Sequence, residues 1–304
     1  MIYVIIVTYN GEKWIKACLD SLASSSMPQK VVVVDNSSTD GTVDLIQQYF
    51  SKVYLLEQSE NLGFGKANNI GISYALDAGA DLVLLLNQDA KVEKHTLKRL
   101  LEYSDLNSEY GIISPVHYNW NGDNLEYYFD LFSKSNSDLV TALKNQEGGM
   151  FEVSFVNAAA WLLPKKTLEA IGGFDPMFYH YGEDNNYCQR VIFHGLKIGV
   201  VSDACIYHDS TVRKGNKAPL FSEAYFNQEI KQLYVQAADI NKNFALKERN
   251  NLRLQQLKVT LRNLRKGHFK NVFGYLKKYL IFERRFNKIL RSREVNKNMG
   301  RHYL

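Results

Sequence analysis

Apolar runs alternate with helical patterns through the first hundred residues of the chain. Each run is a short, continuous stretch rich in Val, Ile and Leu, which predicts a strand buried on both faces. The runs are residues 2–8, 31–34, 53–56 and 82–86. Between them, apolar residues recur at the spacing of a helix, and Asp40 is the expected N-cap of the second helix. The alternation predicts an α/β fold with a mostly parallel sheet.

Polar residues follow three of these predicted strands at the point where each strand ends. They are Thr8-Tyr9-Asn10, Asp35-Asn36 and Asn87-Gln88-Asp89. In open α/β sheets the ligand lies outside the carboxyl ends of the strands. The sequence therefore predicts a binding site at this edge of the sheet.

The rest of the chain is less regular until its last third. Residues 117–153 are polar and predict loops or an antiparallel insertion, whereas 155–163, 198–201 and 205–208 are expected strands. From residue 222 onward the pattern is helical. The length of 304 residues allows two domains, and we expect them at 1–221 and 222–304.

Composition indicates a soluble globular protein. Apolar residues make up 45% and charged residues 23%, which excludes a disordered or fibrous chain. No apolar run approaches the ~20 residues that span a bilayer, and the first residues predict a strand rather than a signal peptide. The three cysteines are far apart, which argues against disulfides and thiolate zinc. We therefore expect a cytoplasmic protein.

Charge is distributed unevenly along the chain. Residues 241–304 contain 18 Lys and Arg but only 3 Asp and Glu, so residues 1–240 have a net charge of −10 within an overall +5. Apolar residues with helical spacing separate the basic ones, a pattern typical of a helix at a membrane interface. We expect an anionic membrane surface as partner, on the inner face of the cell membrane. The alternative is packing on the first domain or in a homodimer. Nucleic acid is not expected, because no base-reading module is present.

Each strand-end group has a functional and a structural interpretation. Asp35 could accept a hydrogen bond from a nucleobase, or it could begin an Asx-turn. Asp89, after the amide Asn87, could hold a divalent cation against a diphosphate, or it could belong to a polar turn. His208 could be a metal ligand or a polar residue at a strand end.

The adjacent carboxylates Glu183 and Asp184 are the candidates for a general base. Apolar surroundings raise the pKa of a carboxyl group, which suits proton abstraction, and two acids are also favoured at a helix N-terminus. Both interpretations can hold together. Aromatic residues crowd the pair, namely Phe174, Phe178, Tyr179 and Tyr181.

Rival motifs fail on spacing. No GxGxxG follows the first strand, and Gly65-Lys66 does not complete a Walker A loop. The GxSxG, HExxH and protein-kinase motifs are absent from the sequence.

Six segments in one order resemble the family 2 glycosyltransferases of the GT-A fold, and bacterial rhamnosyltransferase-like members most of all. They are IIVTYNGEKWIKACLDSL, VVVVDNSSTDGT, NLGFGKANNIG, LLLNQDA, NAAAWLLPKKTLEAIGGFDPMFYHYGEDNNYCQR and IYHDS. The resemblance covers about residues 1–210. It implies an inverting transferase that uses a dTDP- or UDP-linked sugar, with rhamnose as a candidate, and Mn²⁺ or Mg²⁺.

The resemblance also implies residue roles on the donor side. Asp35 would accept from the base ring, with Asn36 beside it. The other nucleotide-sugar contacts would be Thr8, Tyr9, Asn10, Asn61, Lys66, Asn87 and Gln88.

Metal and catalytic roles follow in the same way. Asp89 matches the last acid of the DxD motif, and His208 matches a histidine that completes the metal site in some members. Asn87 stands where the motif has its first acid, so one ligand charge is missing. Asp184 matches the catalytic base, with Glu183 beside it.

Asn157 and Trp161 fall in the segment that borders donor and acceptor, and Trp161 could equally be a core residue.

The implied reaction moves a sugar to a hydroxyl of a saccharide or lipid-linked acceptor in cell-surface polysaccharide synthesis. One alternative is a sugar nucleotidyltransferase, although the Gly-rich, Arg-containing loop expected after its first strand is missing. The other is a non-catalytic relative that binds a sugar nucleotide or a membrane. The amide at Asn87 favours it, whereas the intact Asp89 and Glu183-Asp184 weigh against it.

Overall fold

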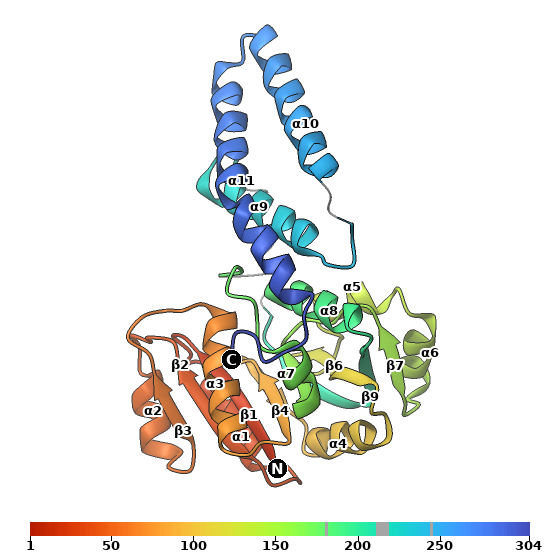
Figure 1. Ribbon diagram of the computed structural model, residues 1–304. Helices are drawn as coiled ribbons and strands as arrows, with labels where there is room; N and C mark the ends of the chain where they lie inside the picture. Colours follow the sequence, from red (N-terminus) through yellow and green to blue (C-terminus); the bar gives the residue numbers. More distant parts are fainter. Residues whose placement is uncertain (180–181, 211–218, 244–245) are drawn as a thin grey trace. The chain divides into compact units, whose positions relative to one another are not determined.

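The chain forms two compact units in the computed structural model (Figure 1). Unit 1 comprises residues 1–212 and 299–304, and unit 2 comprises residues 213–298. The structure describes residues 1–179, 182–210, 219–243 and 246–304. The expected two-domain organisation with a boundary at residue 221 stays a prediction, because compactness alone does not show independent folding.

Unit 1 is built on one nine-stranded sheet. Its described strands are β1 (Ile2–Thr8), β2 (Lys30–Asp35), β3 (Tyr54–Glu57), β4 (Leu82–Leu86), β5 (Ala90–Val92), β6 (Tyr110–Asn119), β7 (Met150–Val153), β8 (Ala160–Pro164) and β9 (Lys197–His208). Their order is β3-β2-β1-β4-β8-β6-β9-β5, with β7 also paired to β9.

The two halves of the sheet differ in strand direction. Strands β1 to β4 are parallel, as the apolar runs predict. Beyond β4 the sheet is mixed, because β8, β5 and β7 run antiparallel to their neighbours while β6 and β9 are parallel. The α/β fold is confirmed, but the mostly parallel arrangement holds only for the first half.

Helices cover both faces of the sheet in unit 1. They are α1 (Ile15–Ala23), α2 (Thr42–Tyr49), α3 (Phe64–Asp77), α4 (Thr96–Leu106), α5 (Tyr127–Ser133), α6 (Ser137–Asn145), α7 (Lys165–Ile171) and α8 (Glu183–Phe193). One apolar cluster contains residues of α3, α7 and α8, and the other contains residues of α1, α2 and α4. Neighbouring β1 residues such as Ile5 and Ile6 alternate between these clusters. This is why the strand reads as a continuous apolar run.

The segment 117–153 contains more regular structure than the sequence predicts. It holds the end of β6, the short helices α5 and α6, and the antiparallel strand β7. The side chain of Glu126 caps α5 by accepting from Phe129 N, and that of Asn136 caps α6 by accepting from Leu139 N. The two strands expected at 198–201 and 205–208 are one strand, β9, whose register with β6 shifts between them.

Unit 2 consists of three described helices, as the pattern from residue 222 predicts. They are α9 (Glu223–Ala238), α10 (Leu246–Arg265) and α11 (Phe269–Asn296). Ser222 caps α9 by accepting from Tyr225 N. Glu283 of α11 binds Arg249 and Arg253 of α10, with N–O distances of 2.6 Å to each. Figure 1 shows α10 and α11 as a helical hairpin.

Candidate functional site

Asp35, at the end of β2, is a buried carboxylate that is only half satisfied. The residue is 2% exposed. Its Oδ2 accepts from the backbone N of Ser38 at 2.9 Å, whereas its Oδ1 has no hydrogen-bond partner in the described part of the chain. An unpaired buried acceptor costs free energy, so an N–H group of a ligand would be favoured there. The geometry suits the predicted contact with a base ring, which stays a prediction.

Asn36 and Asn61 bind each other. The Asn36 Nδ2 donates to Asn61 Oδ1 at 2.9 Å, and Asn36 Oδ1 accepts from Leu62 N at 2.8 Å. These bonds fasten the turn before α3 to the end of β2. Lys66 is exposed in the first turn of α3, where its cation can reach a ligand. The two amides therefore position the turn that presents Lys66.

Gln88 connects the ends of β4 and β1. Its Oε1 accepts from Thr8 Oγ1 at 2.6 Å and from Tyr9 N at 3.0 Å, and its Nε2 donates to Tyr9 O at 3.2 Å. Asn10 adopts a left-handed conformation, with φ 48°, and its Oδ1 accepts from Thr39 N at 2.8 Å. The side chains of Thr8 and Gln88 are thus engaged with this loop, while the Tyr9 ring is exposed.

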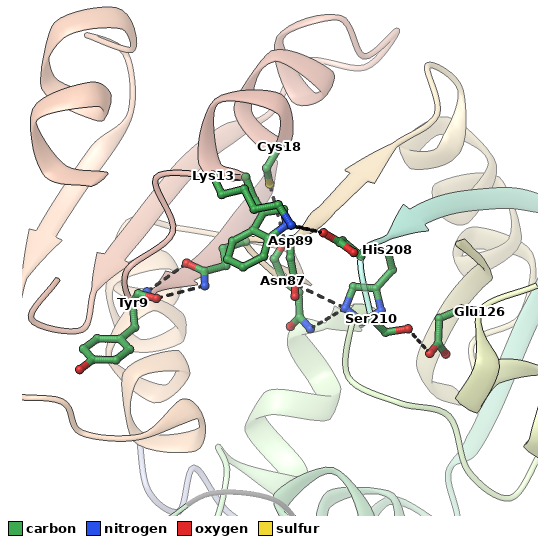
Figure 2. Close-up of polar contacts among 11 residues, drawn as sticks. Tyr9, Lys13, Cys18, Asn87, Asp89, Glu126, His208 and Ser210 are labelled. Carbon is green, nitrogen blue, oxygen red and sulfur yellow. Dashed lines mark hydrogen bonds and ion pairs between the residues drawn. The ribbon is translucent and has the colours of Figure 1, made fainter. Parts of the chain in front are cut away.

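Asp89, His208 and Asn87 lie together (Figure 2). The antiparallel pairing of β5 with β9 sets Ala90 opposite His208, which brings the histidine beside the preceding carboxylate. His208 Nε2 is 3.3 Å from Asp89 Oδ1 and 3.4 Å from Asn87 Nδ2. The structure therefore brings together three side chains that are 121 residues apart at their extremes.

This set of three fits a divalent cation. A carboxylate oxygen, an imidazole nitrogen and an amide oxygen are ligand types that Mn²⁺ and Mg²⁺ accept, with substrate phosphates completing the shell. Among the described residues, no group of three or more His, Cys, Asp and Glu side chains could hold a metal. Asp89 and His208 are two such side chains, and the amide of Asn87 is the third polar group beside them.

The charge state of His208 is set by competing effects. Burial on its own would lower the pKa of the imidazole, but the hydrogen bond and charge of Asp89, helped by Glu126 and Asp209, raise that pKa above its ordinary value. Burial, and then the positive charge of His208, lower the pKa of the neighbouring buried His117 well below its usual range. His208 therefore keeps its proton to a higher pH than usual beside the Asp89 carboxylate, and a metal ion would have to displace that proton to bind the imidazole.

Hydrogen bonds with Trp14, Lys13 and Glu126 hold the segment after β9. Asp209 Oδ2 accepts from Trp14 Nε1 at 2.7 Å and from Lys13 Nζ at 2.9 Å, which lowers the pKa of Asp209. Ser210 donates to Glu126, the residue that also caps α5. Sequence reasoning missed these residues, because their partners are 84 to 196 residues away. They hold Asp209 and Ser210, the two residues that follow His208 at the end of β9 (Figure 2).

Glu183 and Asp184 begin α8, as expected for acids at a helix N-terminus. Glu183 is buried and Asp184 is half-buried. The Asp184 Oδ1 accepts from Asn185 N at 2.7 Å and from Asn185 Nδ2 at 3.1 Å. Tyr181 lies outside the described residues. Of the pair, Asp184 is the more accessible carboxylate.

Asn157 and Trp161 differ in exposure. Asn157 is half-buried before β8, a position open to a ligand. Trp161 is 0% exposed and stacks on Phe174 with ring centroids 6.1 Å apart, with Tyr187 at 5.7 Å. The structure places Trp161 in the apolar core, which favours the packing interpretation of that residue.

Comparisons with known proteins match this chain to one family. The profile of a family described as Glycosyl transferase family 2 matches residues 3–170. The dTDP-rhamnosyl transferase RfbF of Shigella flexneri is 28% identical over 209 residues, which cover 68% of each chain.

Solved structures show the same fold. Staphylococcus aureus TarS 1-349 in complex with UDP-GlcNAc matches with a TM-score of 0.55 and 22% identity, covering 79% of this chain and 66% of that one. Mannosyltransferase PcManGT from Pyrobaculum calidifontis, in complex with GDP-Man and Mn²⁺, gives a TM-score of 0.56 and 19% identity, covering 79% and 63%.

Within the described residues, none of the helices has a stretch long and apolar enough to cross a bilayer.

Proposed function

Since this chain belongs to glycosyl transferase family 2, we propose that it transfers a sugar from a nucleoside-diphosphate sugar to a hydroxyl group with inversion at the anomeric carbon. The observation that carries the proposal is that two acidic groups lie at the carboxyl ends of the strands on either side of β1. Asp35, with one unpaired oxygen, ends β2, and the Asp89–His208 pair follows β4. Both strands flank β1 in the sheet.

The donor is proposed to bind across these strand ends. Asp35 accepts from the base, and the loop held by Gln88, with Tyr9 and Asn10, lines the nucleotide. Lys66 at the start of α3 supplies positive charge near the phosphates. Each of these groups already has a fixed backbone, so little ordering is needed on binding.

Asp89 and His208, with the oxygen of Asn87, are the proposed holders of Mn²⁺ or Mg²⁺. A cation there supplies positive charge against the departing diphosphate. This proposed site has one carboxylate ligand, Asp89. The substrate phosphates must therefore contribute more of the cation's coordination than they would in a site with two acidic ligands. The cation should therefore bind more tightly with the donor than alone.

Asp184 is the proposed general base. It takes the proton from the acceptor hydroxyl as that oxygen attacks the anomeric carbon, and the bond from that carbon to the diphosphate oxygen breaks. Attack from the face opposite the leaving group inverts the configuration. The hydrogen bonds from Asn185 orient the Asp184 carboxylate for this role.

Rhamnose from a dTDP-linked donor is the proposed sugar, with UDP-linked sugars as the other donor class. The similarity to a dTDP-rhamnosyl transferase supports this choice. The proposed acceptor is a saccharide or lipid-linked saccharide of the cell surface.

A donor screen tests the proposal. The full chain is incubated with Mn²⁺ and a panel of dTDP-, UDP- and GDP-sugars, and release of the nucleoside diphosphate is measured. We expect slow hydrolysis of one donor, lost on addition of EDTA. Absence of hydrolysis and of donor binding across the panel would contradict the proposal.

Unit 2 is proposed to attach the enzyme to an anionic membrane surface. Leu254, Leu257, Leu261 and Leu264 form an exposed leucine face on α10, with exposed fractions between 44% and 54%. Residues 249–282 contain nine Lys and Arg and no Asp or Glu. A second copy would bring like charges together, whereas anionic lipid would neutralise them and accept the leucines.

A further inference from the structure

Residues 299–304 belong to unit 1, although the whole of unit 2 separates them from the rest of it in sequence. Gly300 N donates to Ala170 O at 2.9 Å, and Gly173 N donates to His302 O at 2.8 Å. Gly172 has a positive φ of 78°, and a Cβ on it would lie 2.2 Å from His302 O. The segment 299–304 therefore lies directly on the turn between α7 and α8, too close for a side chain to fit between them.

Arg190 of α8 is the centre of this contact. Its side chain is almost fully buried and donates to Ile171 O and, at 2.6 Å, to Gly173 O. The guanidinium lies over the rings of Tyr187 and Tyr303, 5.3 Å and 5.4 Å from their centroids. The carbonyls and rings together offset part of the cost of burying this charge.

Tyr303 continues the contact to the loop ahead of α8. Its hydroxyl donates to Asp175 Oδ2 at 3.3 Å, and Asp175 Oδ1 accepts from Met177 N at 2.8 Å. The ring of Tyr303 therefore touches α8 through Arg190, and its hydroxyl reaches the approach to α8 through Asp175. A single side chain therefore contacts both α8, at Arg190, and the loop that precedes it, at Asp175.

The same loop is fixed on its other side by α3. Asn69 Nδ2 donates to Phe174 O at 2.8 Å, and Asn69 Oδ1 accepts from Phe174 N at 2.7 Å. Phe174 in turn packs against Tyr187 of α8, with ring centroids 5.1 Å apart. The loop is thus held between Asn69 and the segment 299–304, and loss of either leaves it supported from one side only.

We propose that residues 299–304 are a positioning segment for the candidate base, with Tyr303 as its principal positioning residue. The segment holds Arg190 and the loop 172–178, and through them it sets where the first turn of α8 places Asp184. Its catalytic consequence rests on the proposed function, whereas its effect on α8 does not. Tyr303 is more than 100 residues away from α8 in sequence, so no local motif announces this role.

The experiment compares Tyr303→Ala and Tyr303→Phe in the full chain. The control is Tyr49→Ala, which removes an exposed tyrosine of α2. Hydrogen–deuterium exchange reports on peptides from α7 to α8, and donor hydrolysis gives kcat and KM. Thermal melting separates a local effect from global loss of stability.

We expect Tyr303→Ala to raise exchange in the loop 172–178 and the first turns of α8, with little change in β1 to β4. Its kcat should fall by about tenfold or more with the donor KM nearly unchanged, because small misplacements of a reacting group are costly. Tyr303→Phe should retain most of the protection, since it keeps the ring over Arg190.

Unchanged exchange in α8 for Tyr303→Ala would overturn the proposal, and so would a uniform rise throughout unit 1. Local loss of protection without any change in kcat would also overturn it, because the segment would then be structural only. If the unmodified protein hydrolyses no donor, the proposed function fails, and the exchange measurement still decides whether the segment holds α8.

Discussion

Unit 1 and unit 2 differ in where their polar and apolar side chains lie. Unit 1 packs the leucines and valines of its strands into the core and gathers polar side chains at the strand ends, where Asp35, Asp89 and His208 lie. Unit 2 keeps the leucine face of α10 exposed among basic residues. A small polar ligand suits the first arrangement, and an extended, anionic, partly apolar surface suits the second. The contrast is the basis for the proposal that unit 1 carries the chemistry and unit 2 the attachment.

Removing the basicity of Asp184 should have a strong effect on turnover that is confined to unit 1. Asp184→Asn preserves shape, so donor binding should survive while kcat falls by about 10²–10⁴-fold. Steady-state hydrolysis or transfer, together with calorimetric donor binding, measures both. Glu183→Gln is the matched control. If Glu183→Gln is inactive and Asp184→Asn is active, the general base is Glu183 and not Asp184.

Asp89→Ala should reduce turnover by about 10²–10³-fold and weaken binding of the nucleoside diphosphate, because Asp89 is the one carboxylate in the proposed set of Asp89, His208 and Asn87. EDTA should produce the same loss in the unaltered protein, with recovery on added Mn²⁺. Asp20→Ala, at an exposed site on α1, is the control. Full activity in EDTA would show that no cation is required.

The leucine face should govern membrane binding without affecting donor hydrolysis. Leu257→Gln with Leu261→Gln should lower binding to vesicles containing phosphatidylglycerol by about tenfold, since each leucine loses its apolar contact with lipid. Leu106→Gln, at an exposed leucine of α4, is the control. Cosedimentation at low and high salt measures the effect. Vesicle binding that does not depend on lipid charge would contradict membrane attachment. A dimer that the double variant disrupts would show that the leucine face contacts a second copy of this chain instead.

Glu283 should matter to unit 2 alone. Its hydrogen bonds with Arg253 and Arg249 outweigh the effect of burial and lower its pKa to about 2 from an ordinary value of 4.5. A carboxyl group whose pKa is lower in the folded state stabilises that state above its unfolded pKa. This stability is lost as pH falls from about 4.5 toward about 2.

Glu283→Gln should therefore cost about 1 kcal/mol of unit 2 stability at neutral pH, because water screens this ion pair, and should remove the loss of stability on acidification. Chemical denaturation at a series of pH values between about 3 and about 7, followed by circular dichroism, measures the free energy of unfolding of each variant. Glu294→Gln, at an exposed site on the same helix, is the control. Equal stability of the two variants would mean that the arginine pair contributes nothing.

The first half of the sheet could be predicted because each strand is a continuous apolar run between helical patterns. Strand β5 has three residues and β6 carries His117 and Pro115, so neither shows such a run. Helices α5 and α6 were missed although Glu126 and Asn136 precede them as N-caps. Asp40 was expected to be the N-cap of α2, but Gly41 occupies that position. The side chain of Asp40 still accepts a hydrogen bond from the backbone N of Thr42, the first residue of the helix.

The candidate site was predictable where it depends on strand ends and not where it depends on long-range contacts. Asp35, Asp89 and His208 follow or end strands, so topology alone gathers them. The sequence does not reveal that Gln88 binds Thr8, or that Trp14 binds Asp209, because these pairings depend on how distant loops meet. The segment 299–304 looked like part of a basic tail and instead belongs to unit 1.

Unit 2 is an insertion rather than an appendage, since unit 1 resumes at residue 299. Residues 299–304, which follow unit 2 in sequence, include Tyr303, whose ring lies against Arg190. Cutting the chain before α9 would therefore remove Tyr303 together with the helices and confuse two effects. Internal excision of residues 213–298, with 299–304 rejoined through a linker, would separate them. The same design would allow another membrane-binding segment to replace residues 213–298, which tests whether membrane attachment is all that the helices contribute.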